Sequence, residues 1–163
     1  MKVYVFGKNQ FDKLMVENGI TDENVESRTD IFLISIVDTD MWLESKEPYF
    51  KEDHENVLNL NFDDVEHDGE PSPTNWNKGT RAFTEEQANK LFQFIKKHRD
   101  KKTCIVHCMA GISRSAGCGT FINGYCGGDW EEFKRNNPQI CPNARVERLL
   151  NQARLNDELN KIN

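Results

Sequence analysis

A cysteine and an arginine six positions apart enclose a run of mostly small residues in the segment HCMAGISRS at 107–115. Cys108 follows an apolar run, and Arg114 follows Met109 to Ser113. A short loop of this kind between a strand and a helix can turn its backbone N–H groups inward around an anion. A thiol at that point loses its proton more readily, because the N–H groups and the helix dipole stabilise the thiolate. Cys108 is therefore a candidate nucleophile at neutral pH.

Arg114 completes the predicted site. Its planar guanidinium can hold two oxygens of a phosphate, and it keeps its charge while the phosphoryl group moves from oxygen to sulfur. The spacing therefore predicts nucleophilic phosphoryl transfer onto Cys108. The residues expected to cradle the phosphate, together with Arg114, are Met109, Ala110, Gly111, Ile112 and Ser113.

Four short segments have the composition of β-strands and must position this loop. KVYVF at 2–6 and IFLISIV at 31–37 are rich in β-branched and aromatic residues, and NVLNLNF at 56–62 alternates polar with apolar residues. TCIVHC at 103–108 is apolar through its centre, which is typical of a buried strand. The nucleophile would then lie at the carboxyl end of a central strand, where open α/β sheets bind ligands.

Helices are expected between and after these strands. TEEQANKLFQFIKKH has Thr84 and Gln87 at capping-box spacing and an apolar face at helical period. Three further helices are expected over 114–126, 129–136 and 142–162. Strands that alternate with helices predict an α/β fold, a single three-layer domain over residues 1–163 with a mostly parallel central sheet flanked by helices.

The segment between Phe62 and Thr84 has no regular period and contains two prolines and two glycines. A connection of this length is typical of a lid, a binding loop or an insertion, and we assign that character to 65–83. Trp76 lies within it and could cover a substrate ring. We expect it instead to anchor the loop on the core, because an aromatic side chain in a loop usually buries itself.

Composition excludes several classes of partner. The formal charge of −6 disfavours a nucleic-acid or anionic-membrane surface. No secretory segment is recognised, and the longest apolar run is too short to span a bilayer. An odd number of cysteines predicts reduced thiols and a cytoplasmic protein. Cys104, His107 and Cys108 lack the spacing of metal ligands, so we expect neither a metal nor a cofactor.

The segment HCMAGISRS resembles the His-Cys-x-x-Gly-x-x-Arg-Ser/Thr signature of cysteine-dependent protein tyrosine phosphatases, and AGISRS is similar to their dual-specificity branch. LNFDD at 60–64 resembles the strand that leads into the family's general-acid loop. NPQICPNARVERLL at 137–150 resembles its Pro-Asn segment before the last helix. The resemblance covers residues 58–150, and residues 1–55 contain no motif that aligns.

This resemblance implies a phosphatase fold and a two-step hydrolysis. Cys108 would attack phosphorus to form a phosphocysteine, and water would then hydrolyse that intermediate. An acid must protonate the leaving oxygen and afterwards act as base on the water. The resemblance favours Asp64 for this role and leaves Asp63 and Asp68 as alternatives.

Three further roles follow from the resemblance alone. Ser115 would donate a hydrogen bond to the sulfur as it leaves in the second step. His107 would orient the loop and tune the thiol. Asn143 would brace the loop from outside.

The function predicted is hydrolysis of phosphotyrosine, and of phosphoserine or phosphothreonine, on protein substrates. Because no counterpart of the pocket-deepening tyrosine loop is found, a shallow site and dual specificity are favoured. One alternative is a phosphatase of inositol lipids or RNA 5′ ends, although the loop lacks the extra basic residues such substrates call for. Another is an inactive phosphopeptide-binding module. The oligomeric state is left open.

Overall fold

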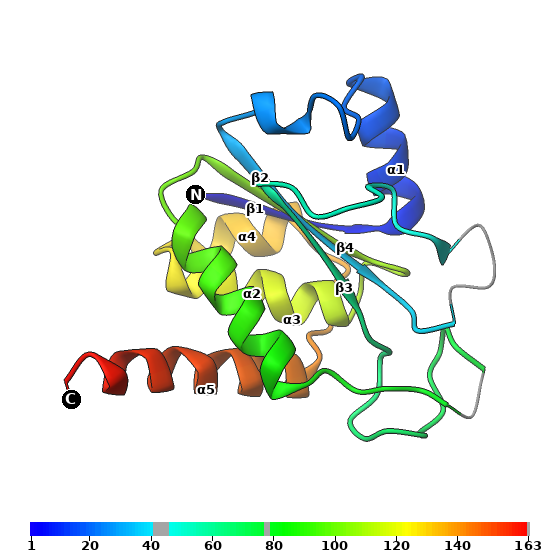
Figure 1. The fold of residues 1–163 in the computed structure, drawn as a ribbon, viewed down its shortest axis with the longest axis vertical. Helices are drawn as coiled ribbons and strands as arrows, with labels where there is room; N and C mark the ends of the chain where they lie inside the picture. The colour runs from blue at the N-terminus through cyan, green and yellow to red at the C-terminus, as the bar shows by residue number, and fades with distance from the viewer. Residues whose placement is uncertain (41–45, 77–78, 163) are drawn as a thin grey trace.

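A four-stranded parallel sheet with strand order β1-β4-β2-β3 forms the centre of the structure (Figure 1). The computed structural model describes residues 1–40, 46–76 and 79–162. The strands are β1 (Lys2–Gly7), β2 (Ile31–Val37), β3 (Val57–Asn61) and β4 (Thr103–Cys108). The α/β prediction with a parallel sheet is confirmed. β4 lies between β1 and β2, so the strand that ends at Cys108 is central.

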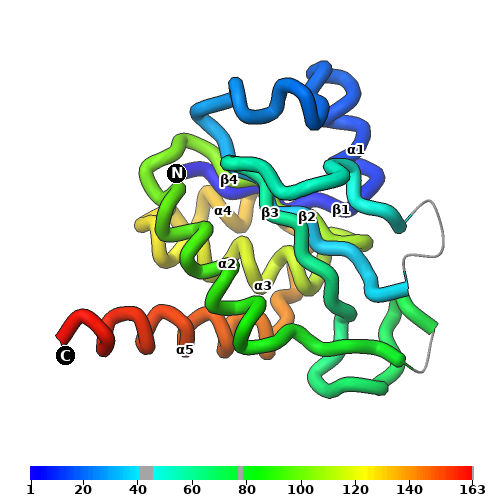
Figure 2. Tube along the Cα trace, in the orientation of Figure 1, coloured from blue at the N-terminus to red at the C-terminus, as the bar shows by residue number. Residues whose placement is uncertain are grey.

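Helices cover both faces of the sheet. Figures 1 and 2 show α2, α3, α4 and α5 on one face and α1 on the other. Their bounds are α1 (Lys8–Glu17), α2 (Glu85–His98), α3 (Arg114–Tyr125), α4 (Trp130–Asn136) and α5 (Ala144–Asn160), with a 3₁₀ turn η1 (Val25–Ser27). The last four agree with the sequence prediction, whereas α1 was not predicted. No helix in the described ranges combines the length and apolarity needed to cross a bilayer.

The alternation of side chains along β2 explains why both faces are covered. All seven residues of β2 are buried. Ile34 and Ile36 belong to the core beneath α2, α3 and α5, while Ile31 and Leu33 belong to the core on the opposite face with Phe11 of α1. Because successive side chains in a strand point to opposite faces, such a strand needs an apolar layer on each side.

Caps set the beginnings of the helices. Thr84 and Gln87 form the predicted capping box at the start of α2, each side chain bonding to the other residue's backbone N–H. Asp129 accepts from the backbone of Glu132 at the start of α4. Asn143 accepts from the backbone of Val146, so that α5 begins where the Pro-Asn segment ends.

The connection between β3 and α2 is held to the sheet by a buried carboxylate. Asp63 accepts hydrogen bonds from the backbone and hydroxyl of Thr39, from Nδ2 of Asn75 and from the backbone N–H of Arg81. The expectation for Trp76 is wrong, because its side chain is 90% exposed and the neighbouring Asn75 is buried in its place. A hydrogen-bonded polar hub, rather than an aromatic anchor, therefore fixes this loop.

Candidate active site

Residues 108–114 lead from the last residue of β4 to the first residue of α3, and we call them the phosphate loop after the ligand expected there. Its carbonyl groups bond outward to the scaffold: Met109 accepts from the backbone of Lys8, and Ile112 accepts from the backbone of Cys141. Gly111 has φ +74°, and a Cβ there would lie 2.3 Å from the backbone nitrogen of Gly7. Only glycine fits this turn, and its backbone N–H points inward to the sulfur of Cys108.

Cys108 lies at the floor of this loop and is 2% exposed. The backbone N–H of Gly111 donates to its Sγ at 3.3 Å, and Oγ of Ser115 lies 3.0 Å from the same sulfur. α3 begins at Arg114, so the positive end of its dipole lies beside the thiol. The sulfur is therefore surrounded by two hydrogen-bonding groups and the start of a helix.

Arg114 is 1% exposed and is held by three acceptors. Its Nη1 donates to Asp38 Oδ1 at 2.6 Å and to the carbonyl of Phe62 at 2.7 Å, and its Nη2 donates to Thr74 Oγ1 at 3.1 Å. Within the described residues, its Nε has no hydrogen-bond partner. A buried, charged donor without a partner is costly, so an acceptor is expected to bind there.

Asp38 is a site residue that the sequence analysis missed. It directly follows β2, is fully buried, and accepts from the hydroxyl of Thr74 at 3.0 Å as well as from Arg114. Nζ of Lys46 lies 3.3 Å from its other oxygen. The signal was present, because an aspartate at the carboxyl end of a strand beside the central one faces the same edge as the nucleophile.

His107 positions the end of β4. It is fully buried, its Nε2 lies 2.8 Å from Oγ of Ser35 on β2, and its ring packs on Phe11. Burial lowers the pKa of His107 to about 3, so the ring is neutral at physiological pH. Its Nδ1 faces the carbonyl of Cys108 at 3.3 Å. The neutral ring therefore holds the backbone of Cys108 and adds no positive charge beside the sulfur.

The three candidate acids occupy different environments. Asp64 Oδ1 accepts from Oγ of Ser113 at 2.7 Å and from Nδ2 of Asn143 at 2.8 Å, so it touches the phosphate loop. Asp63 is the buried hub described above. Burial alone would raise the pKa of Asp63, but its hydrogen bonds outweigh burial and lower that pKa. Asp68 is exposed and accepts from the backbone of Ala82. Among the three, and within the described part of the chain, only Asp64 forms a hydrogen bond with the phosphate loop.

Asn143 braces the site from outside the loop. Its backbone N–H donates to the carbonyl of Ser113, while its side chain caps α5 and donates to Asp64. One residue thus joins the start of α5, the phosphate loop and the candidate acid. The bracing role implied by the family resemblance has a direct structural counterpart here.

No protein-family model and no curated protein matches this sequence. Among solved structures, the PTP-2 phosphatase of Cydia pomonella superposes with a TM-score of 0.50 and 18% identity, over 93% of this chain and 85% of that one. The chain has the protein tyrosine phosphatase fold.

Two further structures are similar to this chain at lower scores. PTPMT1 in complex with PI(5)P has a TM-score of 0.45 and 14% identity, over 98% of this chain and 94% of that one. A human tyrosine phosphatase-like serine/threonine/tyrosine-interacting protein has a TM-score of 0.47 and 19% identity, over 83% and 85%.

Within this protein tyrosine phosphatase fold, the remaining cysteines differ from Cys108 in their surroundings. Cys104 and Cys118 are fully buried, and burial raises the pKa of both thiols. Cys126 is half-buried and Cys141 is exposed. All five are free thiols in the structure. Because burial disfavours the thiolate, the thiols of Cys104 and Cys118 stay protonated at neutral pH and pack as small apolar residues of the core.

Proposed function

We propose that this chain is a phosphatase that hydrolyses phosphate monoesters on proteins, phosphotyrosine first and phosphoserine or phosphothreonine as well. The observation that supports this most strongly is the Nε of the buried Arg114, which has no hydrogen-bond partner among the described residues and lies in the loop whose Gly111 N–H faces the Cys108 sulfur. An oxyanion of a phosphate ester would give Nε the acceptor that it lacks. A guanidinium favours such an acceptor because it binds two oxygens at once.

The first step is transfer of the phosphoryl group to sulfur. The Cys108 thiolate attacks phosphorus, the S–P bond forms as the P–O bond to the substrate breaks, and Asp64 gives its proton to the leaving oxygen. Arg114 and the loop N–H groups hold the three non-bridging oxygens throughout. The contact between Asp64 and Ser113 supports this assignment of the acid, because it places the carboxyl at the edge of the loop.

The second step is hydrolysis of the phosphocysteine. Asp64, now ionised, takes a proton from water as the water oxygen attacks phosphorus and the S–P bond breaks. Ser115 Oγ, 3.0 Å from the sulfur, donates a hydrogen bond to the departing thiolate. Inorganic phosphate then leaves and the starting protonation states are restored.

Protein substrates are favoured over inositol lipids and RNA 5′ ends by the neutral character of the loop. The residues Met109, Ala110, Ile112 and Ser113 contribute no basic side chain. A polyanionic headgroup carries several negative charges, whereas the loop contains one arginine. A single phosphate on an otherwise neutral side chain is a better electrostatic complement to one guanidinium.

The test is turnover of 4-nitrophenyl phosphate and of a phosphotyrosyl peptide in buffer containing EDTA. We expect turnover by the wild-type protein and none by Cys108→Ser, while Cys126→Ser, a matched change at the end of α3, retains activity. Activity that persists in Cys108→Ser would reject the nucleophile. A wild-type protein that binds the phosphopeptide but never hydrolyses it would instead be a binding module.

A further inference from the structure

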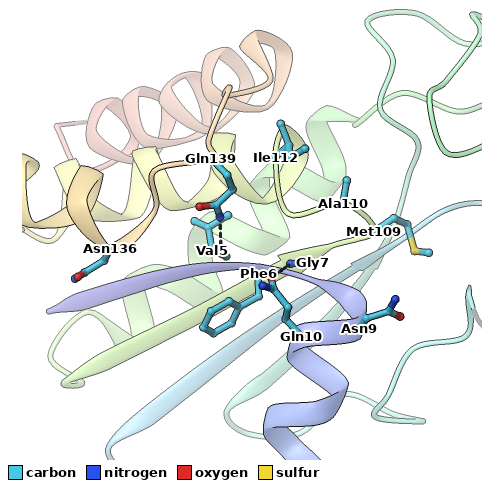
Figure 3. A pocket seen from close by; sticks show the side chains of 10 residues that line it. All are labelled: Val5, Phe6, Gly7, Asn9, Gln10, Met109, Ala110, Ile112, Asn136 and Gln139. Atoms are coloured by element: carbon cyan, nitrogen blue, oxygen red, sulfur yellow. Dashed lines mark hydrogen bonds between the residues drawn. The ribbon is translucent and has the colours of Figure 1, made fainter.

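A pocket of about 540 Å³ lies on the outer side of the phosphate loop (Figure 3). Its walls come from the end of β1, the first turn of α1, the loop itself and the segment that joins α4 to α5. Gly7 is paired with Cys108 in register, so this pocket opens at the same edge of the sheet as the nucleophile. The pocket and the phosphate cradle therefore share the phosphate loop as a common wall.

Four carboxamides line the pocket from two sides (Figure 3). Asn9 and Gln10 come from α1, Asn136 is the last residue of α4, and Gln139 lies between α4 and α5. The Gln139 side chain donates to the carbonyls of Val5 and Gly111, which leaves its Oε1 as a fixed acceptor. Gln10 Oε1 accepts from the backbone of Gly7, which leaves its Nε2 as a donor on the opposite wall.

Asn9 and Asn136 are both exposed, and neither side chain makes a hydrogen bond to another described residue, so both carboxamides are open to a ligand. The walls thus present donors and acceptors in similar number, and the lining contains no acidic, basic or histidine side chain. Ile112, 44% exposed, adds apolar surface at the rim. A ligand that alternates donors with acceptors and has no net charge matches this lining, and an extended peptide main chain has that pattern.

We propose that this pocket binds the main chain of neutral residues that flank the phosphorylated residue of a protein substrate. The inference rests on the proposed function, and it specifies the substrate class as a peptide segment without charged side chains next to the phosphoresidue. The phosphate enters the cradle, and the adjoining peptide crosses the loop into the pocket. The four carboxamides then bond to its N–H and C=O groups.

The experiment compares one substrate that reaches the pocket with one that does not. The probes are a phosphotyrosyl peptide with three neutral residues on each side, the same peptide N-methylated at its flanking amides, and 4-nitrophenyl phosphate. The variant is Asn9→Ala/Asn136→Ala, since no hydrogen bond joins either side chain to the loop in the described structure. Asn160→Ala, at the exposed end of α5, is the matched control.

We expect the double variant to lower kcat/KM for the peptide about tenfold, through KM, because each lost neutral hydrogen bond is worth a factor of a few. Its kcat/KM for 4-nitrophenyl phosphate should stay within twofold of wild type. Asn160→Ala should leave kcat/KM unchanged for both substrates. N-methylation of the peptide should lower kcat/KM with the wild-type protein and have little further effect on kcat/KM with the double variant.

The outcomes separate this proposal from the one on which it rests. If neither substrate is turned over, the proposed function fails. If 4-nitrophenyl phosphate is hydrolysed but the double variant handles the peptide like wild type, the pocket proposal alone is overturned. The pocket proposal is also overturned if the variant selectively impairs a short-chain phosphoinositide, because the pocket would then serve a lipid headgroup.

Discussion

Arg114 and Asp38 form an ion pair that is almost completely removed from water, with 2.6 Å between Nη1 and Oδ1. The two residues are far apart in sequence and meet because β2 and β4 are parallel neighbours whose carboxyl ends lie side by side. With Nη1 engaged by Asp38 and Phe62, Nε is left without a partner among the described residues. In the proposed mechanism, the ion pair therefore sets which edge of the guanidinium faces the phosphate.

Replacing Asp38 by asparagine should impair both stability and phosphate binding. Removing one partner of a buried ion pair leaves an uncompensated charge and costs about 3–5 kcal/mol of unfolding free energy. We also expect weaker inhibition by inorganic phosphate, because the guanidinium loses the carboxylate that orients it. Urea unfolding and phosphate inhibition of aryl phosphate turnover measure the two effects. Asp30→Asn, on an exposed carboxylate, should leave both unchanged; equal effects of the two variants would contradict an orienting role for Asp38.

The proposed acid predicts a dependence on the leaving group. Asp64→Asn cannot donate a proton, so turnover of phenyl phosphate should fall about 10²- to 10⁴-fold, while a better leaving group such as 4-nitrophenol should suffer less. The pH profile of the variant should also lose the inflection that the acid contributes. Asp68→Asn, an exposed carboxylate in the same loop, is the control and should keep the wild-type profile. An unaltered profile in Asp64→Asn would transfer the role to Asp63 or Asp68.

Gly111→Ala should abolish turnover while lowering thermal stability to a smaller extent. The residue has φ +74°, and an added Cβ would lie 2.3 Å from the backbone of Gly7, so the loop must open. Loss of the cradle removes the oxyanion donors and the N–H that faces Cys108. Gly124→Ala is the matched control, because it lies in α3 with open space around the new methyl, and it should stabilise the protein by about 0.5–1 kcal/mol. Turnover and thermal unfolding of both variants decide this.

Much of the candidate active-site loop could be predicted from the sequence because its parts are local. The strand, the small residues and the arginine of 103–114 are consecutive, and Gly111 has the positive φ that the turn requires. The four predicted strands and the last four helices follow from periodicity and caps in the same way. The helix α1 was missed although Phe11 and Met15 are spaced for one helix face, since a short apolar pattern without a side-chain cap is a weak signal.

The features that escaped prediction depend on contacts between distant segments. Asp38 meets Arg114 only once the strand order is known, and the pocket beside the loop joins β1 to a segment near residue 139. The surroundings that distinguish Asp63, Asp64 and Asp68 also depend on the fold, because these carboxylates meet different neighbours. Sequence spacing cannot tell a buried hub from an acid at the loop.

The buried His107 makes a prediction about stability and pH. Its pKa is lowered from 6.5 to about 3 in the folded protein, chiefly by burial. In the unfolded chain the ring binds a proton once the pH falls below its ordinary pKa of 6.5, whereas in the folded protein it stays neutral down to a pH of about 3. Between these two pH values the unfolded state therefore binds more protons than the folded state. Stability contributed by the neutral ring is therefore present above pH 6.5 and is lost as the pH falls toward 3, by at most about 1.4 kcal/mol per pH unit.

The measurement is the free energy of unfolding by urea at pH 7.5 and pH 5. His98 is also buried with a lowered pKa and contributes in the same direction, so the wild-type slope reports both rings. His107→Gln should be less stable at pH 7.5, because the contacts to Ser35 and Phe11 change, yet lose less stability between the two pH values than wild type. His67→Gln, on an exposed ring, should retain the full wild-type slope. If His107→Gln has the wild-type slope as well, the ring is not the group whose protonation is linked to unfolding.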